Sequence, residues 1–231
     1  MADFFRRVEK KYIITEEQLQ IVQKAIKDKM LEDEHGRSTI CNIYFDSEQY
    51  DLIRHSITKP VYKDKIRLRS YNIPTKDSKI YLEIKRKYDG VVSKRRIETT
   101  LSEFYKSEHT ANTQVEIELQ YYFKHYDLRP TMFLSYERIA YYDKENRDFR
   151  LTFDGNIIAR DYDLQIEKGN YGSHILNNDK YIMEVKTLGA MPIWFVKMLD
   201  KLQVCPAGFS KYGEAYTELI LKKNNKQKEV I

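Results

Sequence analysis

The sequence predicts an α+β fold in which antiparallel strands form a tunnel barrel, with a polar, basic interior and helices packed on the outside. Strand-like segments outnumber helical ones along the 231 residues. Several strands carry basic residues at alternate positions, so that one face is charged and the other apolar. The helical segments carry apolar stripes, which need an apolar sheet surface to cover. We expect residues 1–221 to form a single domain and residues 222–231 to form a disordered basic tail.

The composition is that of a globular protein, with 42% hydrophobic and 32% charged residues. No apolar run approaches the roughly 20 residues that span a bilayer, and the charged N-terminal segment lacks a signal-peptide core, so we expect a cytoplasmic location. Cys41 and Cys205 have no paired spacing, which indicates neither a disulfide framework nor a zinc site. The net charge of +5 is modest, so the placement of the basic residues matters more than their number.

The chain begins with a predicted strand and helix. Residues 6–14 alternate between charged and apolar side chains, the pattern of a strand. Thr15 and Gln18 then have the spacing of a capping box, and apolar residues recur at helical intervals as far as Met30. Two segments follow, a strand and then a turn or short helix: residues 38–46 and 47–57.

Three strands with the clearest alternation come next, at residues 63–71, 79–88 and 91–100. The first two are separated by the turn-like segment "NIPTKDS". The second and third are separated by Asp-Gly, a strong hairpin dipeptide. We therefore expect consecutive antiparallel pairing across this part of the chain.

The remaining elements are a helix, three strands and a final helix. Residues 112–127 alternate at first like a strand, but their apolar residues fit a helix over the whole length, and we expect a helix. Pro192 opens the last helix, whose predicted apolar face carries Ile193, Val196 and Leu199, with Leu202 beyond them. The three strands between these helices are residues 129–143, 148–162 and 179–188.

Residues two apart in a strand share a face, so charged faces can be read by parity. Lys65, Arg67 and Arg69 lie on one face of their strand, opposite Ile66 and Leu68. The other strands repeat this alternation, with these residues on the charged faces: Tyr81, Glu83, Lys85 and Lys87; Lys94, Arg96 and Glu98; Tyr136 and Arg138; Arg150, Thr152 and Asp154; Glu184 and Lys186.

These charged faces have an ordinary explanation and a functional one. For a single strand, a polar face is the solvent side of a half-buried antiparallel sheet. Across neighbouring strands, however, aligned like charges destabilise a sheet, so the alignment indicates a bound anion. A barrel with the charge inside and helices outside accommodates both the anion and the apolar helix faces. The core would then lie between barrel and helices.

Phosphate is the anion that suits this interior. Arginine binds phosphate oxygens bidentately and lysine acts as a mobile point charge, so a row of both indicates several phosphates in series. Nucleic acid fits less well, because single-strand binding also uses stacking aromatics and few besides Tyr81 and Tyr136 lie on the charged parity. We expect no nucleic-acid partner.

Carboxylates are interleaved with the basic residues of these faces, and their role stays open between two alternatives. They can ligate a hard divalent cation that bridges phosphate oxygens, or they can be ion-pair partners that hold the arginines in place. The residues concerned are Glu9, Glu83, Glu98 and Glu184.

Eight segments in collinear order, from Arg6 to Glu218, resemble the VTC domain in a stand-alone, bacterial-type version. This is the polyphosphate polymerase branch of the triphosphate tunnel metalloenzymes, in the CYTH-like superfamily. The resemblance implies an antiparallel tunnel barrel that transfers the γ-phosphate of ATP onto inorganic polyphosphate with Mn²⁺ or Mg²⁺. The segments are "RRVEKKYII", "YFDSEQYDLI", "DKIRLRSY", "YLEIKRKYDGVVSKRRI", "FLSYERIAY", "FRLTFD", "YIMEVKT" and "GFSKYGEAY".

The resemblance also implies roles for individual residues. Glu184 is the implied metal ligand, with Glu9 and Glu83 as further candidates. The basic residues implied to contact the reacting phosphates are Lys11, Arg54, Arg67, Arg69, Lys85, Lys94, Arg138, Arg150 and Lys211. Further substrate contacts are implied for Arg96, Tyr136, Ser210 and Lys186. For each residue singly, a structural salt bridge is the alternative.

One departure from the superfamily bears on the reaction. Hydrolytic members begin with Glu-x-Glu-x-Lys, whereas this chain has Arg7, Glu9 and Lys11 there. Losing a carboxylate should weaken hydrolysis more than transfer, because an anionic phosphate acceptor needs no general base. A triphosphate hydrolase and a non-catalytic polyphosphate-binding module stay as alternatives. The sequence shows neither the SPX domain nor the membrane helices of eukaryotic versions, and leaves a membrane partner protein open.

Overall fold

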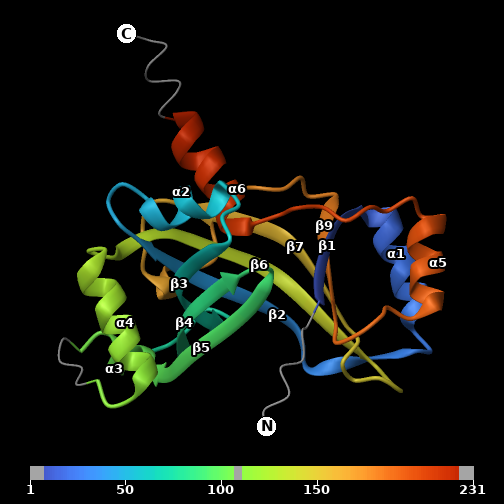
Figure 1. The fold of residues 1–231 in the computed structure, drawn as a ribbon, viewed down its shortest axis with the longest axis horizontal. Coiled ribbons are helices and arrows are strands. Elements are labelled where there is room, and N and C mark those ends of the chain that lie inside the picture. The colour runs from blue at the N-terminus through green and yellow to red at the C-terminus, as the bar shows by residue number, and fades with distance from the viewer. Residues whose placement is uncertain (1–7, 107–110, 224–231) are drawn as a thin grey trace. The chain divides into compact units, whose positions relative to one another are not determined.

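The computed structural model describes residues 8–106 and 111–223 (Figure 1). Within them the chain forms strands β1 to β9 and helices α1 to α6, and every strand pair with an assigned register is antiparallel. The α+β class and the antiparallel sheet are therefore confirmed. The chain divides into two compact units, which are described separately: unit 1 is Met1–Ser38, Tyr136–Ile157 and Leu176–Phe209, and unit 2 is Thr39–Ser135, Ile158–Ile175 and Ser210–Ile231.

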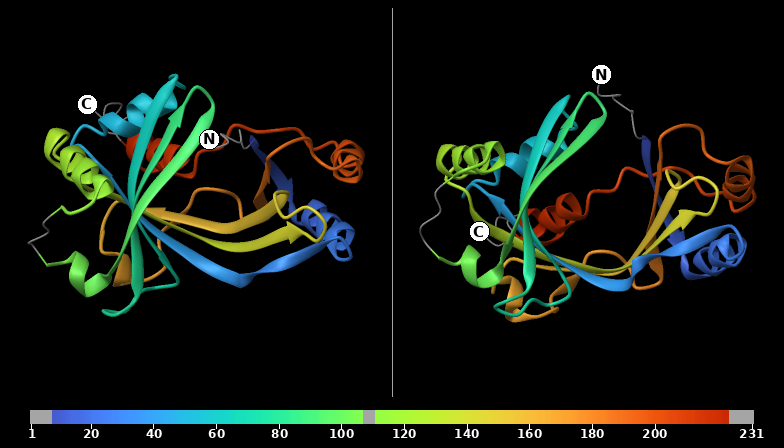
Figure 2. Two further views of the ribbon diagram at one scale, coloured as in Figure 1. Left: turned by 60° about the horizontal axis from the view of Figure 1, so that its bottom comes forward. Right: turned by 90° about the horizontal axis from the view of Figure 1, so that it is seen from below.

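Unit 1 contains the strand order β1-β9-β7-β6-β2. Three of these strands, β2, β6 and β7, supply residues to both units. Two helices belong to unit 1, and they lie side by side in both views of Figure 2. The elements are β1 (Val8–Thr15), α1 (Glu16–Ile26), β2 (Met30–Asp46), β6 (Arg129–Asp143), β7 (Arg150–Arg160), β9 (Lys180–Thr187) and α5 (Ile193–Lys201).

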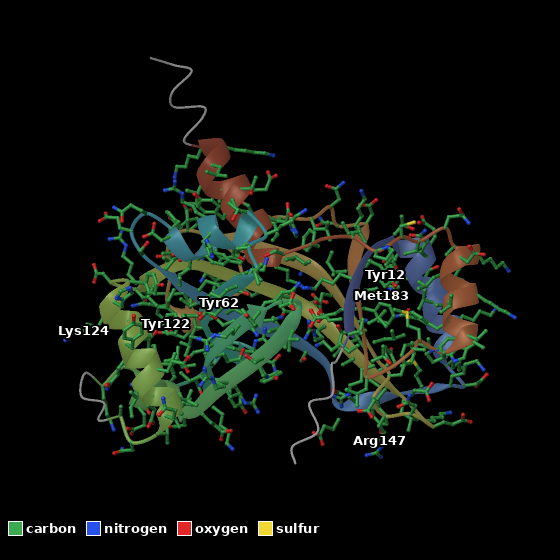
Figure 3. The ribbon with its side chains drawn as sticks, in the orientation of Figure 1. Tyr12, Tyr62, Tyr122, Lys124, Arg147 and Met183 are labelled. Atoms are coloured by element: carbon green, nitrogen blue, oxygen red, sulfur yellow. The ribbon has the colours of Figure 1, made fainter. Side chains whose placement is uncertain are left out.

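The core of unit 1 lies between the helices and one face of its strands. Tyr12 and Met183, labelled in Figure 3, are direct partners across β1 and β9, and both are buried. Leu19 and Val22 of α1 and Phe195 of α5 pack into the same apolar cluster. The capping box predicted at the start of α1 is present, with Thr15 and Gln18 bonding reciprocally. The helices thus cover the apolar face, and the charged residues lie on the other.

Unit 2 contains the strand order β6-β2-β3-β4-β5, in which β4 and β5 form the hairpin predicted at Asp-Gly (Figure 2). Unit 2 also has several short elements, including a two-residue strand beside β7. The elements of unit 2 that have not yet been given are α2 (Asp51–Ile57), β3 (Tyr62–Tyr71), β4 (Lys79–Tyr88), β5 (Val91–Thr100), α3 (Leu101–Phe104), α4 (Gln114–His125), the 3₁₀ turn Ile166–Lys168, β8 (Ser173–His174), α6 (Lys211–Tyr216) and the π-helical turn Thr217–Leu221.

The core of unit 2 repeats this arrangement, because α4 covers the apolar face of its strands. Leu119 of α4 packs in one cluster with Ile66, Leu68 and Ile84 of β3 and β4. Hydrogen bonds also hold α4 against the strands. Tyr122 of α4 and Tyr62 of β3, both labelled in Figure 3, donate to the carboxylate of Asp64 in β3. The prediction of helices against apolar strand faces is therefore confirmed within each unit.

Three expectations about elements were wrong or incomplete. The first helix ends at Ile26, and Met30 starts β2, which is eight residues longer than predicted, because pairing within the sheet overrides a locally polar sequence. The short elements α3, α6 and β8 were not predicted. Of the basic tail, Lys222 and Lys223 continue the C-terminal helical segment, and residues 224–231 lie outside the described part. The prediction of a single domain stays a prediction.

The predicted apolar face of α5 was also wrong. Ile193 and Val196 are exposed, at 73% and 49%, while Phe195 is fully buried. Leu199 is buried as expected. The helix is apolar around much of its circumference, and the face that carries the larger ring is the one that packs, since aromatic side chains bury the most area.

Candidate functional site

Unit 1 carries a compact group of charged residues on the strand face opposite its core. Across β1 and β9, Lys11 is the direct partner of Glu184, and Glu9 that of Lys186. Thr152 of β7 lies directly opposite Glu184 on its other side. The strand alternation therefore gathers both carboxylates and both lysines on one face.

Glu184 is the most buried carboxylate that the sequence predicted as a metal ligand in this unit. Its oxygens lie 3.3 Å from Lys186 Nζ and 3.7 Å from Arg138 Nη2, and its side chain shares a hydrogen bond with Glu9. Burial alone would raise the pKa of Glu184, but the attraction of Lys186, the bond to Glu9, and the charges of Arg138 and Lys11 lower the pKa well below its usual range. The site thus holds this carboxylate ionised.

Lys11 is held in the same group by an ion pair of 3.1 Å with Glu9. Burial acts to lower the pKa of Lys11, but the negative charges of Glu184 and Glu9 outweigh it and raise the pKa. Lys11 therefore stays protonated at neutral pH.

Arg138 is fixed by a carboxylate that the sequence did not assign to the site. Its Nε and Nη2 donate to the two oxygens of Asp154, at 2.6 and 2.8 Å, and Asp154 has no exposed surface. The guanidinium also lies 5.1 Å from the ring centre of Tyr136. A bidentate pair of this kind holds an arginine in one orientation. Strand parity could have pointed to Asp154 as a site residue, because the alternation of the sequence puts it on the same strand face as Arg150.

The fit of this group to a divalent cation rests on the carboxylate pair. Among the described residues no group of three or more His, Cys, Asp or Glu side chains is arranged to hold a metal ion. The Glu9 and Glu184 carboxylates nevertheless lie close enough to share a hydrogen bond, and two ionised carboxylates can only lie so close with a proton or a cation between them. Magnesium is commonly bound through one or two carboxylates, with substrate phosphates completing its shell. The pair suits a metal of that kind.

Arg150 lies at the start of β7, where its side chain is exposed. It lines a shallow hollow of unit 1 together with Asp33, Glu34, Tyr142 and Arg147, the last of which is labelled in Figure 3. Its strand partner is Lys186. The structure thus puts Arg150 on the charged face but beside acidic residues, and its phosphate contact stays a prediction.

Unit 2 carries the basic residues in rows across its strands. Each row is a set of direct partners on neighbouring strands, with side chains on the face away from α4. The rows are Asn42, Arg69, Tyr81 and Glu98; Tyr44, Arg67, Glu83 and Arg96; and Lys65, Lys85 and Lys94. These three rows therefore bring six cations and two carboxylates together on one face, as the parity of the sequence predicts.

Glu83 is the centre of these rows and has no exposed surface. Arg67 Nη2 lies 2.7 Å from it, Lys94 Nζ 3.5 Å and Arg69 Nε 4.0 Å. Burial acts to raise the pKa of Glu83, but the charges of Arg67, Arg69 and Lys94 outweigh it and lower the pKa to about 2. Of the two roles left open for Glu83, this geometry favours the ion-pair partner.

The two arginines are further held by neutral groups that the sequence did not single out. Arg69 Nε donates to Asn42 Oδ1 at 2.9 Å, and Arg67 Nη1 donates to the Tyr44 hydroxyl at 3.3 Å. The Tyr44 ring stacks on Tyr212 of α6 with centroids 4.3 Å apart. A chain of contacts therefore runs from Arg67 to the helix that carries Lys211.

Ser210 precedes α6 and caps it by accepting a hydrogen bond from the Gly213 amide at 3.1 Å. It also accepts a hydrogen bond from Lys65 Nζ at 2.8 Å. Lys65 shares its row with Lys85 and Lys94 but was not among the predicted site residues. Lys211 follows as the first residue of α6 and is half-buried.

Arg54 and Arg96 stand apart from these ion pairs. Arg54 is exposed on α2. Arg96 is exposed on β5, with its guanidinium 4.3 Å from the ring centre of Tyr81. The roles predicted for both stay predictions.

Comparison with models of protein families shows the family to which the chain belongs. A family model for the VTC domain matches residues 6–220, nearly the whole sequence. The chain belongs to the VTC domain family. A search of curated proteins found no match to this VTC domain.

Two solved structures are similar to this VTC domain at low sequence identity. One is a putative adenylate cyclase from Vibrio parahaemolyticus, with a TM-score of 0.50 and 11% identity over 90% of this chain and 96% of that one. Another is a putative adenylyl cyclase from Hippeastrum described as having a dominant triphosphatase activity, with a TM-score of 0.48 and 16% identity over 93% and 97%. At such identities the first of these shows the fold alone. No helix in the part of the VTC domain that the structure describes is long and apolar enough to cross a bilayer.

Proposed function

We propose that this VTC domain is a metal-dependent phosphotransferase that moves the γ-phosphate of ATP onto a growing inorganic polyphosphate chain. The observation that carries the proposal is the set of aligned rows in unit 2, which hold six cations and only two carboxylates. Aligned like charges destabilise a sheet unless an anion neutralises them. Membership of the VTC family supports phosphoryl chemistry as the use of that anion site.

In unit 2 the residues of the rows bind phosphate oxygens. Arg67 and Arg69, oriented by Tyr44, Asn42 and Glu83, present fixed donors. Lysines on the same face act as mobile charges along a phosphate chain. The residues proposed for this work are Lys65, Arg67, Arg69, Lys85, Lys94, Ser210 and Lys211, and we include Arg54 of α2 on the family resemblance alone.

In unit 1 the charged group acts on the transferring phosphoryl group. Arg138, locked by Asp154, stabilises charge that spreads over the phosphoryl oxygens, and Lys11, Lys186 and Arg150 add to the positive field. Glu184 and Glu9 would hold Mn²⁺ or Mg²⁺. Once bound, the metal supplies neutralisation of the phosphate charge and orientation of the substrate.

The reaction needs no general base from the protein. An oxygen of the terminal phosphate of the polyphosphate chain forms a bond to the γ-phosphorus of ATP. The bond between that phosphorus and the bridging oxygen to the β-phosphate breaks, and ADP leaves with the electron pair. Because the attacking oxygen is already ionised near neutral pH, positioning and electrostatics carry the catalysis.

Hydrolysis of a triphosphate is the second candidate function. The observation that favours it is the contact between Glu9 and Glu184, since a carboxylate pair can orient water as well as hold a metal. Against it stands Arg7, which lies outside the described residues and occupies the sequence position where the hydrolytic members of the superfamily carry a glutamate.

The test is to incubate the protein with ATP and Mn²⁺ and to resolve the products by chain length. Polyphosphate with equimolar ADP supports the proposal, whereas orthophosphate without polymer supports hydrolysis. Bound but unchanged ATP would leave only a binding module. The location in the cell and any membrane partner are separate proposals, which fractionation and co-purification would test.

Replacing Glu184 tests its assignment as the metal ligand. We expect Glu184→Ala to lower the metal-dependent rate by at least a hundredfold while the melting temperature shows a folded protein. The control is Glu137→Ala, which removes a half-exposed carboxylate of the same unit whose ion pair with Arg37 is long, at 3.9 Å, and which accepts one hydrogen bond from Asn156. Undiminished turnover in Glu184→Ala would remove this residue from the site.

A further inference from the structure

Tyr81 is an aromatic residue within the first basic row of unit 2. It lies on β4 between Arg69 of β3 and Glu98 of β5, which are its direct strand partners. Its side chain shares a face with Glu83 and Lys85 and is half-buried. The phosphoryl transfer proposed above assigns no role to Tyr81.

The neighbours of Tyr81 hold its ring in place. Glu98 accepts from Lys79 Nζ at 2.7 Å, and bonds to Lys79 and Tyr81 lower the pKa of Glu98. The Arg96 guanidinium lies 4.3 Å from the centre of the Tyr81 ring. Tyr71 meets the ring edge-on with centroids 6.0 Å apart. A ring fixed in this way, stacked on an exposed arginine, is a ready-made surface for a flat aromatic ligand.

The position of this surface relative to the cations indicates the kind of ligand. One row along the strands, about 6.8 Å away, lie Arg67 and Glu83. The row after that is made only of lysines, Lys65, Lys85 and Lys94. The face therefore runs from aromatic to basic in the order in which a nucleoside triphosphate presents its base and its phosphates.

We propose that Tyr81 and Arg96 bind the base of a nucleoside triphosphate by stacking, while its phosphates lie toward Arg67, Arg69 and Lys94. The inference rests on the proposed function, because it names the part of unit 2 that recognises ATP as a nucleotide. Stacking tolerates any base and favours the larger purines. Inorganic tripolyphosphate, which has no base, gains nothing from this site.

The test measures binding of ATP and of inorganic tripolyphosphate by calorimetry, without divalent metal so that no turnover occurs. We expect Tyr81→Leu to weaken ATP binding about tenfold, the loss of one base–aromatic stack, and to change tripolyphosphate binding less than twofold. Tyr81→Phe keeps the ring without the hydroxyl and should retain ATP affinity within about threefold. Tyr88→Leu is the matched control, because Tyr88 is 62% exposed on the opposite face of the same strand.

Each outcome decides the proposal. Unchanged ATP binding in Tyr81→Leu, or equal losses for ATP and tripolyphosphate, overturns it. The result is separable from the polymerase assay: a protein that needs Tyr81 for ATP yet makes no polymer keeps this site and loses the proposed function.

Discussion

Glu83 shows at the scale of one residue how a face crowded with cations can be part of a stable fold. Its carboxylate is fully buried and lies within ion-pair distance of Arg67, Arg69 and Lys94. Removing one partner of a buried charge group is costly because the remaining charges are left uncompensated in a poorly hydrated environment. The same carboxylate leaves the face with a net positive charge, which a polyanion can neutralise.

The ion pairs of Glu83 make the stability of the protein depend on pH. Its pKa in the folded state is about 2, below the ordinary value of 4.5, so the folded state binds its proton less readily than the unfolded chain does. The contribution, about 3 kcal/mol, is present above pH 4.5 and is lost as the pH falls toward 2. We expect Glu83→Gln to lower the free energy of unfolding by about 3 kcal/mol at pH 7.

Denaturant unfolding of both proteins at pH 7, 4.5 and 3 measures this effect. The difference between wild type and Glu83→Gln should shrink as the pH falls, since the wild-type carboxylate gradually loses its advantage. A difference that stays constant over this range would mean that Glu83 is not the group responsible.

At the scale of elements, α5 shows what periodicity leaves undecided. Its sequence fits more than one apolar stripe, and the expected stripe through Ile193 and Val196 faces solvent. The packed stripe instead brings Phe195 within 5.2 Å of Phe149, between ring centroids. The choice depends on the shape of the surface that the helix meets, which no local pattern contains.

Two substitutions in α5 separate these stripes. We expect Phe195→Ala to lower the free energy of unfolding by roughly 3–5 kcal/mol, because it empties a fully buried site. We expect Ile193→Ala to change it by less than about 0.5 kcal/mol, because Ile193 is mostly exposed. Thermal and denaturant unfolding of both variants check this, and equal losses would contradict the packing of α5.

At the scale of the whole molecule, the two units use the two faces of their strands in the same way. Helices cover the apolar face, and charged side chains gather on the other. The overall charge of +5 does not reveal this, since 40 basic residues are nearly balanced by 35 acidic ones. What distinguishes the chain is the alignment of its cations across strands.

That alignment predicts a preference for linear polyanions. A ligand that binds only the native state raises the melting temperature, so tripolyphosphate should stabilise the protein more than sulfate at equal anionic charge. The doubly substituted Lys85→Gln, Lys94→Gln protein should lose most of that gain. The control is Lys124→Gln, since Lys124 lies exposed on α4 and is labelled in Figure 3. Equal stabilisation by both anions would argue against a site for several phosphates.

Much of the candidate site was predictable because strand parity is a local property. Lys11, Arg67, Arg69, Lys94, Arg138, Glu184 and Lys186 all lie on the faces that the alternation predicts. The partners that orient them were not predictable. Asp154 holds Arg138, Ser210 accepts from Lys65, and Tyr44 stacks on Tyr212, all across segments distant in the chain.

The sequence by itself determined most of the strands, the capping box, the hairpin and the charged faces, because each depends on neighbours within a few residues. Only the tertiary structure decided which carboxylate serves which cation, which stripe of α5 is buried, and that Tyr81 stacks beside the first row. These depend on register between strands and on the fit of one surface to another. Both are set by the energy of packing and pairing over the whole chain.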